Sequence, residues 1–136
     1  MAVIKSDAYG HLLEKLVPDI DDIVDGYGVV RIGEAKKIRK FSDKKVLLMQ
    51  GVYSHLDLKR SIDLNLDLVV HNNDQFELVA KNKNFNNLWM KVNTGMNRLG
   101  FEIDEFINIY NEYLSNSEFV LMSHLACLLY TSDAAD

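Results

Sequence analysis

Six short, apolar, β-prone runs recur along this chain at intervals of about 20–25 residues, and polar segments with helical periodicity separate them. We predict strands at residues 3–4, 28–30, 46–49, 66–70, 88–92 and 119–122. Continuous runs such as 68–70 are typical of strands that are buried on both faces. This alternation predicts a parallel α/β sheet whose strands are joined by crossover helices.

About five helices are expected between these strands. We predict them at residues 32–40, after Ser54, after Asn73 and at 104–114, with one more near the N-terminus. Ser54 is an N-cap candidate, and Asp57 follows three residues on, as in a capping box with the shorter acid. The residues expected to pack on the sheet are Phe76 and Val79 and the stripe Ile103, Phe106, Ile107, Tyr110 and Leu114.

Composition narrows the class of protein. The length of 136 residues suffices for one domain with a core, and a net charge of −5 without a basic cluster argues against nucleic-acid binding. The single cysteine, Cys127, cannot form a disulfide within the chain, which is consistent with a reducing compartment. No apolar run approaches the ~20 residues that cross a membrane. A cytoplasmic location is therefore expected, and the histidine spacing predicts no metal site.

Lys5 is the first candidate for chemistry. It ends the apolar run that begins at Ala2, and a small polar turn with Tyr9 and Gly10 follows. An ammonium at the end of a buried strand is partly desolvated, which favours the neutral, nucleophilic amine that Schiff-base chemistry needs. Taken alone, a lysine in this position is more often a solvated strand end.

Three segments carry recognisable motifs: residues 2–11 (AVIKSDAYGH), 89–101 (WMKVNTGMNRLGF) and 121–126 (LMSHLA). Together, and in this order, they resemble the alanine racemase family, and the first resembles its pyridoxal-phosphate (PLP) attachment motif. A weaker match lies at 26–35. The resemblance covers about residues 2–126. It departs from the family at Leu12, where glycine is usual, and at Asn93, where aspartate is frequent.

The strand rhythm alone leaves two architectures open, a doubly wound open sheet or part of a (β/α)8 barrel. The resemblance implies the barrel, which needs about 250 residues when complete. We therefore expect residues 1–126 to form a partial PLP-binding (β/α)8 TIM-type barrel of about six parallel strands. Residues 127–136 resemble a translated sequencing adapter and are expected to be a non-native tail, against the alternative of a genuine polar terminus. Cys127 is ambiguous, because some relatives also carry it.

The resemblance implies roles for five residues. Lys5 would hold PLP covalently and act as one of two acid/base groups, and the hydroxyl of Tyr9 would bind the cofactor phosphate. Arg98 would contact the phenolic oxygen of the cofactor and bind the substrate carboxylate. Lys91 would be carbamylated as in some relatives, or else be a structural lysine paired with an acid. His124 would lie beneath the PLP ring. The structural alternative for Tyr9 is a half-buried aromatic residue at the rim of the barrel, without a role in binding the cofactor.

The function implied is PLP-dependent interconversion of L-alanine and D-alanine for peptidoglycan, by a cytoplasmic homodimer that binds neither nucleic acid nor membrane. The family's second base lies in a segment that this chain does not match, so the chain as given is expected to be inactive. The alternatives are a broad-specificity amino-acid racemase, a non-catalytic PLP-binding barrel, and an open-sheet binding module with a coincidental lysine.

Overall fold

The computed structural model describes residues 1–82 and 87–124, and this part of the chain contains one sheet of six parallel strands. The strands are β1 (Ala2–Val3), β2 (Gly26–Val29), β3 (Lys45–Leu48), β4 (Asp67–Val70), β5 (Leu88–Lys91) and β6 (Val120–Met122). Each strand pairs with the next one along the chain. A doubly wound sheet reverses its strand order at a switch point, and this sheet does not. The predicted partial barrel is confirmed.

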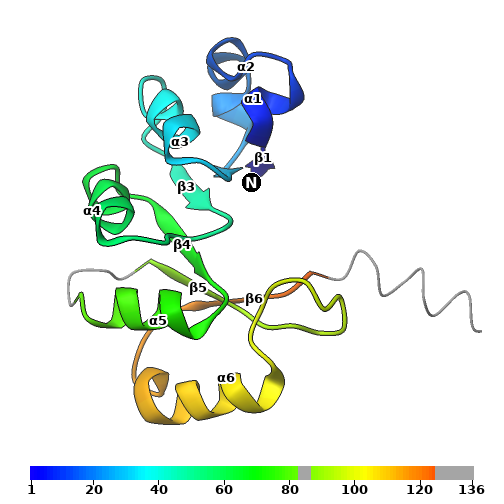
Figure 1. The fold of residues 1–136 in the computed structure, drawn as a ribbon. Coiled ribbons are helices and arrows are strands. Elements are labelled where there is room, and N and C mark those ends of the chain that lie inside the picture. The colour runs from blue at the N-terminus through cyan, green and yellow to red at the C-terminus, as the bar shows by residue number, and fades with distance from the viewer. Residues whose placement is uncertain (83–86, 125–136) are drawn as a thin grey trace, which may run out of the picture.

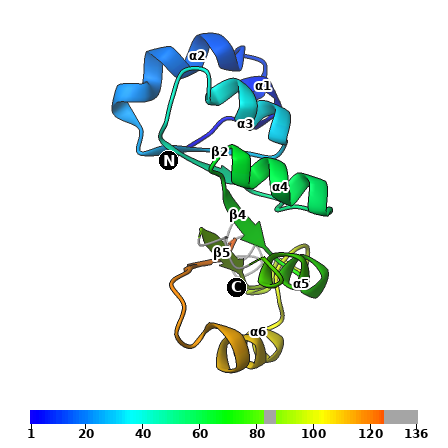
Figure 2. The ribbon, with the colours of Figure 1, turned by 90° about the vertical axis from the view of Figure 1, so that its left-hand side faces the viewer.

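Helices connect successive strands and lie along the outer side of the sheet, as Figure 1 shows. They are α1 (Lys5–Tyr9), α2 (Leu13–Ile20), α3 (Ile32–Ile38), α4 (His55–Asp63), α5 (Asn73–Ala80) and α6 (Ile103–Ile109). A 3-10 turn (Asp21–Ile23) follows α2, and a π turn (Tyr110–Leu114) extends α6. Figure 2, turned by 90°, shows the N-terminal helices and the pair α5 and α6 at opposite ends of this arrangement. Because the strands are parallel, their carboxyl ends meet along one rim.

The central strands carry the core. All residues of β2 and β4 are buried, as expected for strands covered on both faces. Leu68, Val46 and Met90 have no exposed surface, and burying each of them contributes roughly 1.5–3 kcal/mol. The buried Asp67 carboxylate accepts a hydrogen bond from Trp89 Nε1 at 3.0 Å and lies 3.9 Å from Lys45 Nζ, so this carboxylate has both a hydrogen-bond donor and a positive charge beside it.

Polar side chains begin two of the predicted helices. Ser54 Oγ accepts from the Asp57 N–H at 3.1 Å, which confirms the N-cap of α4. The Asp57 carboxylate accepts from the Ser54 hydroxyl at 2.8 Å rather than from its backbone, so the capping box is incomplete. Asn72, one residue earlier than expected, caps α5 through the Gln75 N–H. Phe76 and Val79 are buried as predicted.

The predicted apolar stripe on α6 is only partly right. Phe106 is half-buried and Leu114 buried, but Ile103, Ile107 and Tyr110 are exposed. The helix turns inward along Phe106 and Ile109, and the π turn after Ile109 changes the spacing that the stripe assumed. The rings of Tyr110 and Phe106 instead both pack edge-on against Phe119, with centroids 6.2 and 6.1 Å from it.

Residues 125–136 lie outside the described part of the chain, and with them the predicted non-native tail and Cys127. Within residues 1–82 and 87–124, no helix is long and apolar enough to cross a membrane.

Candidate active site at the carboxyl ends of the strands

Lys5 stands where β1 ends, at the rim formed by the carboxyl ends of the strands. The Ile4 N–H donates to Gly28 O at 2.9 Å, so parallel pairing holds the chain up to the residue before Lys5. The Lys5 side chain is half-buried and lines a cavity of about 630 Å³. The ends of β2 and β3 supply Val30, Arg31 and Gln50 to the same cavity. The rim of a (β/α) barrel is where such enzymes place their chemistry.

The segment after Lys5 is a left-handed turn. Ser6, Asp7, Ala8 and Tyr9 have φ between 53° and 56°, and Gly10 ends the turn at φ 90°. A left-handed helical conformation costs a non-glycine residue about 1–2 kcal/mol, so tertiary contacts must hold this turn. Ala8 is buried, and the Asp7 carboxylate accepts from the Leu13 N–H at 3.2 Å. Tyr9 is 60% exposed, and no hydrogen bond of the described residues engages its hydroxyl.

Lys91 is the last residue of β5, and its side chain is buried. Among residues 1–82 and 87–124, no carboxylate forms an ion pair with its Nζ. Burial lowers the pKa of Lys91, and the positive charge of Arg98 lowers it further. The alternative of a lysine paired with an acid therefore has no support in the described part of the chain.

The loop between Lys91 and Arg98 is closed on itself. The Phe101 N–H donates to Lys91 O, and the Asn93 N–H donates to Phe101 O, at 2.9 and 2.8 Å. Gly100 has φ 125°, and a Cβ there would lie 2.6 Å from the Asn93 nitrogen. The close approach that requires glycine at this position is thus to the chain's own backbone.

The Asn93 side chain organises the same loop. Its Oδ1 accepts from the Gly95 and Asn97 N–H groups at 3.1 and 3.0 Å. Its Nδ2 donates to Glu102 Oε1 at 2.7 Å. An aspartate here would keep the two acceptor contacts but would face the Glu102 carboxylate. Asparagine therefore suits both sets of contacts at this position.

His124 lies two residues beyond β6, close to the Lys91–Arg98 loop. Its neighbour Ser123 donates to Val92 O at 3.1 Å and shares a hydrogen bond of 2.6 Å with Thr94. His124 itself is half-buried. These contacts tie the end of β6 to the start of the loop.

Comparison with known proteins agrees with this arrangement. The model of the family described as "Alanine racemase, N-terminal domain" matches residues 1–136. The chain belongs to this family. It is 38% identical to the alanine racemase of Vesicomyosocius okutanii over 131 residues, covering 93% of this chain and 37% of that protein. The alanine racemase of Psychrobacter sp. strain PRwf-1 is 37% identical, with 93% and 35% covered.

Solved alanine racemases share the fold. The structure from Acinetobacter baumannii superimposes with a TM-score of 0.84 at 30% identity, covering 93% of this chain and 39% of that one. The biosynthetic enzyme from Pseudomonas aeruginosa gives 0.83 at 30% identity, with 93% and 37% covered. The chain therefore spans little more than a third of the length of the alanine racemases it matches.

Within this alanine racemase domain, the five predicted site residues form two groups on the rim. Lys5 and Tyr9 stand at one end of the sheet, after β1, and Lys91, Arg98 and His124 stand at the other, after β5 and β6. No hydrogen bond or ion pair between described residues joins the two groups. Two further rim residues, Glu34 and Gln50, were not singled out from the sequence. The sequence feature that could have indicated Glu34 is its position three residues after Arg31, at the start of a helix that follows a strand, as in a capping box.

A buried histidine lies between the two groups. His71 follows β4 and is 5% exposed, and its Nε2 lies 3.3 Å from Gln50 O. Gln75 closes the network, accepting from the His71 N–H at 3.1 Å and donating to Gln50 O at 2.8 Å. Burial lowers the pKa of His71, and the charge of Lys91 adds to this. The part of the domain that the structure describes contains no His, Cys, Asp or Glu group suited to a metal ion.

The lowered pKa of His71 predicts a pH dependence of stability. The unfolded chain binds this proton near pH 6.5, above the pH at which the folded state accepts it. Stability is therefore full above about pH 6.5 and falls as pH decreases, by up to about 1.4 kcal/mol per pH unit. The free energy of unfolding can be measured in urea between pH 5 and 8, at steps of roughly half a pH unit. We expect its decrease at low pH to disappear in His71→Gln. The exposed His55→Gln is the control, and an unchanged slope in His71→Gln would contradict the assignment.

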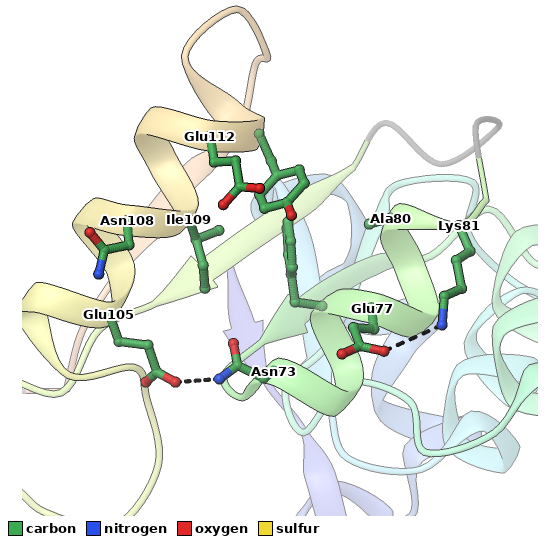
Figure 3. Close-up of a pocket in the computed structure, with 10 residues that line it drawn as sticks. Asn73, Glu77, Ala80, Lys81, Glu105, Asn108, Ile109 and Glu112 are labelled. Atoms are coloured by element: carbon green, nitrogen blue, oxygen red, sulfur yellow. Dashed lines mark hydrogen bonds and ion pairs between the residues drawn. The ribbon is translucent and has the colours of Figure 1, made fainter.

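A second cavity, of about 670 Å³, lies between α5 and α6 (Figure 3). An Asn73–Glu105 hydrogen bond spans it at one end, and the Glu77–Lys81 ion pair, at 3.3 Å, lies on α5. Ile109, Phe76 and Tyr113 form its apolar part. It contains none of the predicted site residues.

Proposed function

We propose that this chain is the cofactor-holding part of a PLP-dependent alanine racemase, with Lys5 as the point of attachment. The observation that carries the proposal is the position of Lys5 at the carboxyl end of β1 in a partial barrel of this family, on a cavity of about 630 Å³. Pockets for small molecules have volumes of about 300–1,000 Å³, so the space suits a cofactor with a small substrate. Because the chain spans about a third of the length of its relatives, the activity is proposed for the full-length gene product.

Two polar groups of the rim, neither of which lines the cavity beside Lys5, suit this cofactor. The Tyr9 hydroxyl is exposed, without a hydrogen bond to a described residue, and is available to donate to a phosphate oxygen. The Arg98 guanidinium is exposed beside Lys91 and offers a planar fork for a carboxylate or phenolic oxygen. When bound, PLP supplies the electron sink for a negative charge on the substrate α-carbon.

The chain's own residues hold the reactants and move one proton. Lys5 Nζ would hold the cofactor, then remove or return the α-proton on the face that leads to D-alanine. Arg98 would bind the alanine carboxylate and so orient the α-carbon. His124 would support the cofactor ring from β6. We propose that the full-length protein is a cytoplasmic homodimer that makes D-alanine for peptidoglycan.

We also propose that Lys91 is carbamylated. Burial lowers the pKa of Lys91, and no carboxylate partner among the described residues opposes this, which favours the neutral amine that reacts with carbon dioxide. The product carries a negative charge beside Arg98 and would orient its guanidinium. This modification relieves the uncompensated positive charge that burial of Lys91 otherwise creates.

Borohydride reduction of the full-length gene product with PLP tests the function. We expect mass spectrometry to find the reduced cofactor on Lys5 and not on exposed lysines such as Lys45, and the unreduced protein to convert L-alanine to D-alanine. Cofactor on another lysine would contradict the site. Covalent capture at Lys5 with turnover of several other amino acids at rates comparable to that of alanine would instead identify a broad-specificity racemase.

A further inference from the structure

One carboxylate contacts the backbone on both sides of the cavity beside Lys5. Glu34 Oε1 accepts from the Ser6 N–H at 2.7 Å and from the Asp7 N–H at 3.4 Å. Glu34 Oε2 accepts from the Val30 and Arg31 N–H groups at 3.2 and 3.0 Å. The side chain therefore joins the chain immediately after Lys5 to the turn between β2 and α3.

The contact to Arg31 is half of a capping box. Glu34 occupies the third position of α3, from which a glutamate commonly reaches back to the N-cap N–H. That local role uses Oε2 alone. The second oxygen faces a segment 28 residues away in the sequence, so local helix capping does not account for it.

The left-handed turn after Lys5 needs this second oxygen. Its own backbone bonds begin with the Ala8 N–H, which donates to Ile4 O at 3.0 Å, so the preceding N–H groups of Ser6 and Asp7 need an acceptor from elsewhere. A carboxylate has enough lone pairs for four donors and carries a charge that strengthens each bond. Glu34 thereby caps a turn whose four residues are each unfavourable in isolation.

We propose that Glu34 is a positioning residue: it fixes the left-handed turn and so sets the direction in which Lys5 enters the cavity. This inference rests on the proposed role of Lys5. Glu34 does not touch the reacting atoms, and it acts through the backbone of the residue that follows Lys5. Gln in its place would turn an NH₂ group toward one of the two pairs of N–H donors. Asp would be too short to reach both pairs.

The test compares Glu34→Gln and Glu34→Asp with Glu14→Gln in the full-length gene product. Glu14 is an exposed carboxylate whose ion pair with Lys40, at 2.7 Å, does not involve the turn. In both Glu34 variants we expect hydrogen exchange of the Ser6 and Asp7 amides to rise about tenfold or more, and the rate of covalent PLP capture at Lys5 to fall about tenfold to a hundredfold. Glu14→Gln should change neither quantity.

The two readouts separate the outcomes. A purely structural glutamate would lower the melting temperature but leave the capture rate of the folded protein unchanged at low temperature, and that result would overturn the proposal. Unchanged amide exchange would overturn it as well. If the unsubstituted protein exchanges slowly at Ser6 but captures no PLP, the proposed function fails, and the positioning role fails with it.

Discussion

Replacing Lys5 by alanine is expected to abolish covalent cofactor binding and to reduce racemisation of alanine by about 10³-fold or more. The variant removes both the amine that holds the cofactor and the group that moves the α-proton, and proton transfer by a positioned side chain alone contributes about 10²–10⁴-fold. D-alanine formation by the full-length gene product, followed with L-alanine as substrate, measures the loss. Lys5→Arg should lose as much activity, because it keeps a charge but not a nucleophilic amine.

Two controls test whether the loss of activity is specific to the amine of Lys5. Lys45→Ala removes an exposed lysine at the opposite end of a strand and should retain full activity. An added small primary amine should restore part of the activity of Lys5→Ala but none of that of Lys5→Arg, whose guanidinium fills the space. If Lys5→Ala keeps even a tenth of the racemase activity, Lys5 is not the catalytic lysine.

Replacing Arg39 by methionine is expected to lower the free energy of unfolding by about 3 kcal/mol. The guanidinium donates to four backbone carbonyl oxygens, two of them just beyond α3 and two in the turn before β4, at 2.6 to 3.2 Å. It joins two loops at the amino ends of β3 and β4. Methionine keeps most of the apolar stem but leaves these carbonyl groups without their donor. Urea unfolding of the full-length gene product measures the change.

The comparison is with Arg60→Met, which removes an exposed arginine. Arg60 forms an ion pair with Asp57 at 3.8 Å, and such a pair contributes at most about 1 kcal/mol. Arg39 lies on the rim opposite to Lys5, so Arg39→Met should leave covalent cofactor binding intact below its unfolding transition. Equal destabilisation by the two substitutions would show that the carbonyl contacts of Arg39 add nothing.

The strands and most helices were predictable because their signals are local. Runs such as 68–70 are apolar on both faces, and Ser54 stands at the helix start it caps, whatever the rest of the chain does. The stripe on α6 failed for Ile103 and Ile107 because the helix turns Phe106 and Ile109 inward instead. Beyond Ile109 it also assumed a regular helix, where the structure has a π turn. A π turn depends on how the helix meets its neighbours, and helical periodicity carries no sign of it.

The sequence by itself determined the parallel α/β class, the family and the residues to expect at the site, because short motifs and apolar runs record these directly. The strand rhythm alone left the barrel and the doubly wound sheet open. The family resemblance implied the barrel, and the strand order of the tertiary structure confirmed it. Only the tertiary structure decided that Lys91 is buried without a described acid partner. The contact of Glu34 with Ser6 joins residues 28 apart in the sequence. Folding brings that carboxylate to the backbone amides after Lys5, and no local sequence pattern predicts this long-range contact.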